Sequence, residues 1–272
     1  MKHVIVIAGP TAGGKSKIAL DIAKREGRVL INADSMQVYR DLRVLTARPT
    51  IVEEAEAPHY LYGYLDAHAH SSMADWVVRA GDVIKNHDKS IVVGGTGMYL
   101  DALMNGISAI PDVPADIREK VRGMDMADVR AQVQECTAVD DQRLRRALEV
   151  QLATGRPLAY FQALPRQKVI EASWKTYLVM PPRDVLYQRI NTRFEKMMAS
   201  GAAEEVAALR MQNPTGGVTK AIGYFEIKEY LAGHMTKEAA AAKASQLSRN
   251  YAKRQMTWFR HQFQADHILT DA

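Results

Sequence analysis

A glycine-rich turn between an apolar run and a helical pattern restricts the fold of this chain more than any other feature. Residues 9–16 fit the pattern G-x-x-x-x-G-K-S, the apolar run 3–8 precedes them, and residues 17–24 follow with apolar side chains at helical spacing. In such a turn the backbone N–H groups point inward and the helix N-terminus adds a positive dipole end. The lysine can reach terminal phosphate oxygens and the serine can hold Mg²⁺. We therefore expect a polyphosphate to bind along the whole turn, which consists of Gly9, Pro10, Thr11, Ala12, Gly13, Gly14, Lys15 and Ser16.

Short apolar runs alternate with helical patterns in the N-terminal part of the chain. We expect strands at 4–8, 29–32, 60–65 and 90–94, and helices at 15–25, 73–85 and 98–104. This alternation requires crossover connections and therefore a parallel sheet. The predicted fold is α/β, a P-loop NTPase-like parallel sheet flanked by helices.

The strand pattern is interrupted between residues 108 and 167, where Pro111 and Pro114 open a charged helical stretch. The sheet resumes at 174–180, helical sequence follows with a break at 213–217, and residues 267–269 are expected to form an edge strand. We predict a first part of the core over 1–107, a small helical insertion subdomain over 108–167, and a second part of the core with a long C-terminal helix over 168–272.

Composition limits the compartment and the partners. The chain has 272 residues, of which 47% are hydrophobic and 25% are charged, as in ordinary soluble globular proteins. The net charge of +5 is compatible with a polyanionic partner. The single cysteine, Cys136, has no disulfide partner and favours a reducing compartment. No run approaches the roughly twenty apolar residues of a membrane span, so we expect a cytoplasmic protein with no membrane partner.

Asp34 follows the second predicted strand, within the segment Asn32-Ala33-Asp34-Ser35-Met36-Gln37. The carboxyl ends of parallel strands are where open α/β sheets bind ligands, so Asp34 is expected beside the phosphate-binding turn. Its carboxylate could orient or deprotonate a nucleophile. Alternatively, Asp34 stabilises a turn or caps a helix, and its neighbours Asn32 and Ser35 are residue types that favour such a turn.

A second glycine-rich turn, at 94–97, follows the strand at 90–94 and converges on the same edge of the sheet. Its Thr96 is either a helix N-cap or a hydroxyl of the site. The strand lacks the terminal aspartate with which motor-type and switch-type NTPases bind Mg²⁺. This absence argues against an NTPase whose function is driven by nucleotide hydrolysis. Alternating Asp66, His68 and His70, with His59, are poor evidence for a metal cluster.

Together these motifs make the sequence similar to the tRNA dimethylallyltransferase family, also called tRNA isopentenyltransferases. The resemblance covers most of the chain, and a kinase would be expected to share only the first of its motifs. The matching segments are G-P-T-A-G-G-K-S at 9–16, N-A-D-S-M-Q-V-Y-R at 32–40, T-A-R-P-T at 46–50, V-G-G-T-G-M-Y at 93–99, D-D-Q-R-L-R-R-A-L-E-V at 140–150, A-I-G-Y at 221–224 and Y-A-K-R-Q-M-T-W-F-R at 251–260.

The resemblance implies a prenyl transferase that moves a dimethylallyl group from dimethylallyl diphosphate to N6 of adenosine 37, beside the anticodon of tRNAs that read UNN codons. The glycine-rich turn would then hold the diphosphate leaving group, assisted by Lys15 and by Mg²⁺ on Ser16. Asp34 would accept the N6 proton, and Thr96 would line the channel between the two substrates. Asp34, Thr96 and Lys15 are thus the expected catalytic residues.

The resemblance also implies contacts with the tRNA anticodon stem-loop, in the insertion and elsewhere. The expected tRNA-binding residues are Asp34, Ser35, Met36, Gln37, Thr96, Arg118, Gln142, Arg143, Leu144, Arg145, Arg146, Lys220 and Tyr224. The chain departs from the family at Phe225, where a basic residue is common. Lys253, Arg254 and Arg260 of the C-terminal helix either contact RNA or are solvated cations of an amphipathic helix.

Three other functions compete with this interpretation. An aspartate after the second strand would also suit a small-molecule kinase, an isopentenyltransferase could use free AMP as its acceptor, and a non-catalytic module could bind RNA without forming a product. We expect a monomer.

Overall fold

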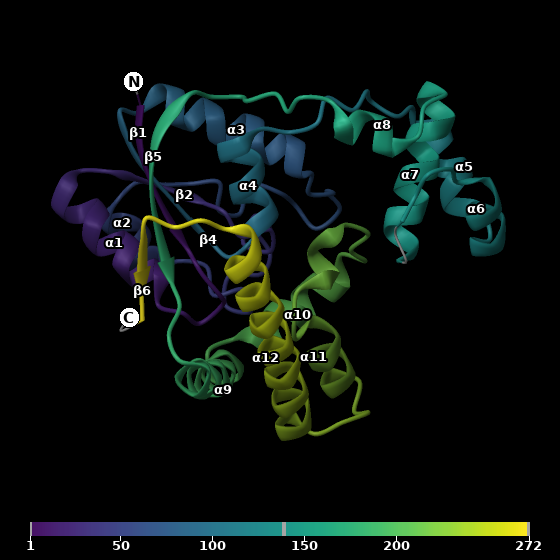
Figure 1. Cartoon of the computed structure of the whole chain (residues 1–272). Coiled ribbons are helices and arrows are strands. Elements are labelled where there is room, and N and C mark those ends of the chain that lie inside the picture. The colour runs from purple at the N-terminus through teal and green to yellow at the C-terminus, as the bar shows by residue number, and fades with distance from the viewer. Residues whose placement is uncertain (1, 138–139, 271–272) are drawn as a thin grey trace. The chain divides into compact units, whose positions relative to one another are not determined.

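The computed structural model describes residues 2–137 and 140–270, and six parallel strands in the order β3-β2-β4-β1-β5-β6 form its central sheet (Figure 1). This sheet is flanked by helices and confirms the predicted α/β fold class. The strands are β1 (Lys2–Ala8), β2 (Val29–Asn32), β3 (His59–Tyr60), β4 (Lys89–Gly94), β5 (Ala172–Val179) and β6 (His267–Leu269).

The central strand β1 is buried on both faces because helices cover the sheet on both sides. Ile5 and Ile7 pack with Ala19 and Ala23 of α1 (Lys15–Glu26) in one apolar cluster. Val4 and Val6 alternate with them and are also buried. On that side α3 (Met73–Asn86) contacts β1. The continuous apolar sequence of β1 is therefore that of a central parallel strand.

The second part of the core is mostly helical. After β5, the longest helix, α12 (Lys237–Gln262, yellow in Figure 1), packs against α9 (Arg183–Ala199) and α11 (Tyr224–Leu231). The remaining helices of the core are α2 (Ile51–Glu56), α4 (Gly97–Asn105), α10 (Ala202–Met211) and the 3₁₀ helix η1 (Gly217–Lys220).

One local prediction is wrong, and one helix was not predicted. The strand expected over 60–65 ends at Tyr60, because Leu61 and Gly63 adopt positive φ angles of 63° and 56° and turn the chain. Helix α2 was not expected, since its Ile51 and Val52 are exposed and give no buried face. Instead, a capping box between Thr50 and Glu53 stabilises its N-terminus.

The chain forms two compact units, Met1–Met104 with Val169–Ala272, and Asn105–Lys168. The second unit contains α5 (Ala115–Gly123), α6 (Met126–Gln132), α7 (Asp141–Thr154) and α8 (Leu158–Ala163). It has its own apolar core of Val121, Val129, Leu144 and Leu148. Across residues 2–137 and 140–270, none of the helices has the length and apolar character needed to cross a membrane.

Candidate active site

The glycine-rich turn joins β1 to α1 and leaves the N-terminus of α1 open. A Cβ atom on Gly9, whose φ is 149°, would lie 2.3 Å from the Val179 carbonyl oxygen, so only glycine allows β5 to approach this closely. Gly14, with a φ of 93°, precedes α1, and no described side chain caps this end of the helix. The first N–H groups of α1 are therefore available to an anion.

Lys15 folds back over this turn. Its Nζ donates a hydrogen bond to the Pro10 carbonyl oxygen at 2.7 Å. Burial lowers the pKa of Lys15 to about 8, against a raising effect of Asp34 and with a smaller lowering effect of Arg193. A buried ammonium next to unshielded N–H groups is an electrostatically suitable partner for phosphate oxygens.

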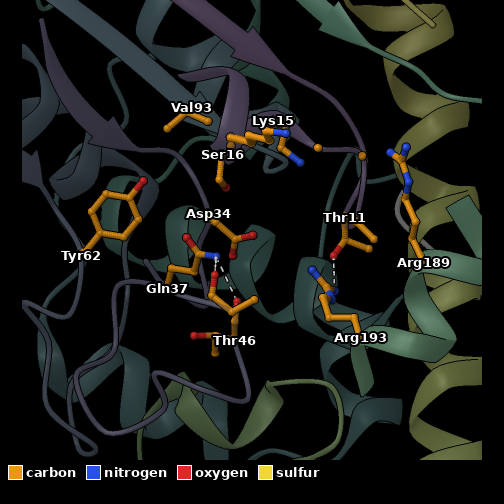
Figure 2. A pocket seen from close by; sticks show the side chains of 16 residues that line it. Thr11, Lys15, Ser16, Asp34, Gln37, Thr46, Tyr62, Val93, Arg189 and Arg193 are labelled. Atoms are coloured by element: carbon orange, nitrogen blue, oxygen red, sulfur yellow. Dashed lines mark hydrogen bonds between the residues drawn. The ribbon is translucent and has the colours of Figure 1, made fainter. Parts of the chain in front are cut away.

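The turn lines a cavity of about 290 Å³ at the carboxyl edge of the sheet. Figure 2 shows Asp34 between Lys15 and Ser16 on one side and Thr11, Arg189 and Arg193 on another. The opposite wall carries Gln37, Thr46, Ala47 and Tyr62. The cavity thus combines an anion-binding loop and two guanidinium groups with a single carboxylate.

The turn after β2 fixes Asp34 at the cavity. The buried Asn32 side chain accepts a hydrogen bond from the Asp34 N–H at 2.8 Å and donates to the carbonyl oxygens of Asp34 and Leu61, both at 3.0 Å. One Asp34 carboxylate oxygen, Oδ1, accepts the Met36 N–H at 2.9 Å. Asp34 therefore organises its turn, and the same carboxylate lines the cavity, where its action on a nucleophile stays a prediction.

Thr96 connects the second glycine-rich turn to the Asp34 turn. Its Oγ1 accepts the Ser35 N–H at 3.0 Å, and its own N–H donates to the Ala33 carbonyl oxygen at 3.1 Å. A Cβ atom on Gly94 would lie 2.2 Å from the Ala33 backbone, so the close approach of these turns requires glycine. The Thr96 hydroxyl therefore supports the segment that carries Asp34.

Met36 and Gln37 follow on the same segment. Gln37 donates from Nε2 to the carbonyl oxygens of Thr46 and Ala47, both at 3.0 Å, and so holds the opposite wall of the cavity. Met36 lines a smaller cavity of about 70 Å³ that shares Thr11, Asp34, Thr46 and Arg193 with the first. Its other lining side chains are mostly apolar and include Leu45, Phe194, Met197 and Ile222.

Sequence reasoning missed several polar residues of the cavity, among them Arg189, Arg193 and Tyr62. Arg193 donates to the Thr11 hydroxyl at 2.7 Å, and burial lowers the pKa of its guanidinium. Arg189 and Arg193 lie four residues apart on α9, the helix after β5, and this spacing places them on one helix face. The four-residue spacing was the sequence pattern from which this pair of arginines could have been predicted. Tyr62 lies in the turn after β3, where burial raises the pKa of its hydroxyl and no pattern marks the position.

The expected tRNA-binding residues of α7 differ in environment. Gln142, Arg143 and Arg146 are exposed, whereas Leu144 packs in the core of the insertion. Arg145 donates to the carbonyl oxygens of Val121, Arg122 and Met124 and so ties α7 to the end of α5. Arg118 of α5 donates to the Val113 carbonyl oxygen from Nε at 2.9 Å and from Nη2 at 2.7 Å.

The expected tRNA-binding residues near α11 also differ. Lys220 is exposed at the end of η1, whereas Tyr224 is buried at the start of α11. Phe225, at the position where the family often has a basic residue, is half-exposed. The Lys243 ammonium lies 5.6 Å from the centre of its ring.

Ser16, the residue expected to hold Mg²⁺, lies at the cavity with one carboxylate near it. Within the described ranges, no group of three His, Cys, Asp or Glu side chains could hold a metal ion. The exposed Ser16 hydroxyl and the Asp34 carboxylate line the same cavity. This donor set suits Mg²⁺, which takes one or two protein oxygens and completes its shell with phosphate oxygens and water.

The comparisons with known proteins agree with the motifs. A family model described as IPP transferase matches residues 37–262. The tRNA dimethylallyltransferase of Bradyrhizobium sp. (strain BTAi1) is 44% identical over 281 residues, covering 96% of this chain and 92% of that protein. The enzyme of the same name from Methylobacterium sp. (strain 4-46) is 45% identical over 280 residues, with coverages of 96% and 91%.

Solved structures give the same assignment. The full-length tRNA isopentenylpyrophosphate transferase from Bacillus halodurans superposes with a TM-score of 0.70 at 30% identity, covering 100% of this chain and 91% of that one. A eukaryotic dimethylallyltransferase acting on tRNA gives a TM-score of 0.84 at 25% identity, with coverages of 100% and 75%. The predicted resemblance is confirmed, and the chain belongs to the IPP transferase family, among its tRNA dimethylallyltransferases.

Proposed function

We propose that this enzyme transfers the dimethylallyl group of dimethylallyl diphosphate to N6 of adenosine 37 in tRNAs that read UNN codons. Family membership makes the chain a tRNA prenyl transferase. The identity of the donor, dimethylallyl diphosphate, and the position of the acceptor, N6 of adenosine 37, are what we propose in addition. The observation that carries it is the presence of a single carboxylate, Asp34, in the cavity that also holds the anion-binding turn and the two arginines.

The cationic side of the cavity would hold the diphosphate. Lys15, Arg189 and Arg193 supply positive charge, and the turn and the N-terminus of α1 supply N–H donors. Such preorganised donors stabilise charge that develops on a leaving group. Ser16 would hold Mg²⁺, which adds to the neutralisation of the diphosphate when it is bound.

Asp34 would act on the acceptor. In the proposed step the N6 lone pair forms a bond to the allylic carbon, and the carbon–oxygen bond breaks with its electron pair going to the diphosphate. The N6 proton passes to the Asp34 carboxylate. An adenine amine is a weak nucleophile, so a positioned base should contribute roughly 10²- to 10⁴-fold to the rate. The adenine of adenosine 37 must leave its stack to reach this cavity, and this unstacking is least costly in a single-stranded loop.

The tRNA partner would be held by exposed cations. Arg143 and Arg146 of α7 and Lys220 of η1 are exposed, as a surface that contacts phosphates requires. In contrast, Leu144 and Tyr224 are buried, so we assign them to packing. We further propose that the enzyme acts as a monomer in the cytoplasm.

One incubation tests this function. The enzyme is mixed with Mg²⁺ and labelled dimethylallyl diphosphate, with either an unmodified tRNA that reads a UNN codon or AMP, and the nucleosides are then analysed. We expect isopentenyladenosine from the tRNA, none from AMP, and none from a transcript with guanosine at position 37. Prenylation of AMP alone would indicate a free-adenylate enzyme. RNA binding without product would indicate a binding module, and ATP turnover with a small acceptor would indicate a kinase.

A further inference from the structure

A buried glutamine of α12 connects the two glycine-rich turns of the active site. The Thr11 N–H donates to Gln255 Oε1 at 2.8 Å, and Gln255 Nε2 donates to the Gly95 carbonyl oxygen at 2.9 Å. The Gln255 side chain is only 6% exposed. A carboxamide offers both an acceptor and a donor, so this one group can satisfy an N–H of the first turn and a carbonyl of the second.

The second turn is shaped to receive α12. A Cβ atom on Gly95 would lie 2.4 Å from Gln255 Nε2, and one on Gly97 would lie 2.3 Å from the Trp258 ring. Neither glycine has a positive φ that requires glycine for backbone reasons. Both are therefore needed for the close approach of the helix that carries Gln255.

The turn that Gln255 holds is also bonded to the turn that carries Asp34, because Gly95 is followed by Thr96. Tyr251, one helical turn earlier on α12, lines the same cavity as Thr96 and Gln255. Thr96 in turn accepts the Ser35 N–H, next to Asp34. On the other side, Arg193 of α9 donates to the Thr11 hydroxyl, so Thr11 is held by two helices.

We propose that Gln255 is a positioning residue that fixes the distance between the diphosphate-binding turn and the Asp34 turn. The inference rests on the proposed function, because it assigns the two turns to the donor and the acceptor. Without the carboxamide, the Thr11 N–H and the Gly95 carbonyl oxygen would both lose a partner in a buried place, which favours other positions of the two turns. The residue acts through these turns and touches neither reacting atom.

Two substitutions test the proposal. Gln255→Leu removes both hydrogen bonds at similar volume, and Gln255→Glu keeps an acceptor but cannot donate to Gly95 when ionised. Gln246→Leu, on the exposed face of α12, is the matched control. The readouts are the affinity for inorganic diphosphate with Mg²⁺ by calorimetry, the affinity for tRNA, kcat and the melting temperature.

We expect Gln255→Leu to weaken diphosphate binding by about tenfold or more and to lower kcat, because two buried partners are lost. Gln255→Glu should weaken diphosphate binding further, since it adds negative charge beside the turn. The tRNA affinity should stay within about twofold of the parent enzyme in both variants. Unchanged diphosphate affinity and kcat in folded Gln255→Leu would overturn the proposal. So would a loss of tRNA affinity that matches the loss of kcat.

Hydrogen exchange in the unsubstituted protein provides a test that needs no folded variant. The Thr11 N–H should be protected about 100-fold or more relative to an unstructured amide, because Gln255 accepts its hydrogen bond inside the fold. Exchange at the unprotected rate would contradict the proposed contact. Neither the diphosphate affinity nor the exchange rate of the Thr11 N–H requires the prenyl acceptor. These two measurements therefore assess Gln255 even if the enzyme fails to prenylate tRNA.

Discussion

Asp34 is the residue on which the proposed chemistry depends. Its Oδ1 already accepts the Met36 N–H, and its turn is fixed by the buried Asn32. Asp34→Asn retains an oxygen for the Met36 N–H but cannot accept the N6 proton. We therefore expect kcat to fall by roughly 10²-fold or more while tRNA affinity changes by less than about twofold.

Steady-state kinetics together with a tRNA filter-binding assay check this prediction. Asp82→Asn, an exposed carboxylate on α3 that pairs with Lys85, is the control and should retain the parent kcat. If Asp34→Asn keeps the parent kcat, Asp34 is not the base and only organises its turn.

Lys15 gives the site a pH dependence. Its pKa is lowered to about 8 by burial, so the charged ammonium form is lost as the pH rises through that value. Diphosphate attracts the charged form, and affinity should decrease as the pH rises through 8, by up to about tenfold per pH unit, with proton uptake on binding. Calorimetry with inorganic diphosphate between pH 7 and pH 9.5, in buffers of different ionisation enthalpy, measures both effects.

Lys15→Arg separates this titration from the protonation of diphosphate itself. The guanidinium stays charged over the whole range, so the pH dependence of the variant reports only the ligand and the rest of the site. Equal slopes in parent and variant would show that Lys15 does not titrate near pH 8.

The sequence identified the glycine-rich turn and Asp34 because each follows an apolar strand directly, and the carboxyl ends of parallel strands meet at one edge. It did not identify Arg193, Tyr62 or Gln255. Arg193 and Gln255 come from helices far along the chain, and their roles depend on how α9 and α12 pack on the sheet. Tyr62 lies in a turn whose course is set by positive φ angles at Leu61 and Gly63.

Among the helices, α7 places neighbouring residues of one short motif in two different environments. Arg143 is 74% exposed and pairs with Asp140, and Arg146 pairs with Glu149 on the surface. Leu144 and Arg145 instead hold the helix within the insertion. A helix with exposed arginines on one face and packed residues on the other can present cations to a polyanion while it stays anchored in its subdomain.

Arg143→Gln and Arg146→Gln should therefore weaken tRNA binding and reduce its salt dependence. Each lost phosphate contact should lower the slope of log K against log salt concentration by about 0.7 for single-stranded or 0.9 for duplex regions. Equilibrium binding measured at several salt concentrations gives this slope. Folding should be unaffected, because both side chains are exposed.

Arg145→Gln is the contrasting substitution on the same helix. It removes a guanidinium that serves three carbonyl oxygens, so it should lower the melting temperature of the protein. If Arg143→Gln and Arg146→Gln keep the parent salt slope, this face of α7 does not contact the RNA backbone.

The strands of the sheet were predictable where burial was continuous, as in β1 and β4, or where a short apolar run ended the chain, as in β6. The course of 61–65 was not predictable, because two positive φ angles override the apolar pattern. Nor was α2, which a capping box stabilises without a buried face. Within α7, the sequence alone could not separate the exposed arginines from Arg145, since its carbonyl partners lie at the end of another helix.

At the scale of the whole molecule, the active site is assembled from three distant parts of the chain. β1 and its turn supply the anion-binding loop, the segments after β2 and β4 supply Asp34 and Thr96, and the C-terminal helices supply Arg193 and Gln255. The parallel order of the sheet brings the first two parts to one edge. Helix α9 then adds Arg189 and Arg193 to the cavity, and α12 places Gln255 between the two glycine-rich turns.

In the proposed reaction the diphosphate and the adenine amine meet in one cavity, on either side of Asp34. A structure of the enzyme bound to an anticodon stem-loop and inorganic diphosphate tests it most directly. We expect diphosphate at Lys15 and the N6 atom of adenosine 37 within about 2.6–3.2 Å of an Asp34 carboxylate oxygen. An amino nitrogen that enters the protein away from the Lys15 turn would contradict it.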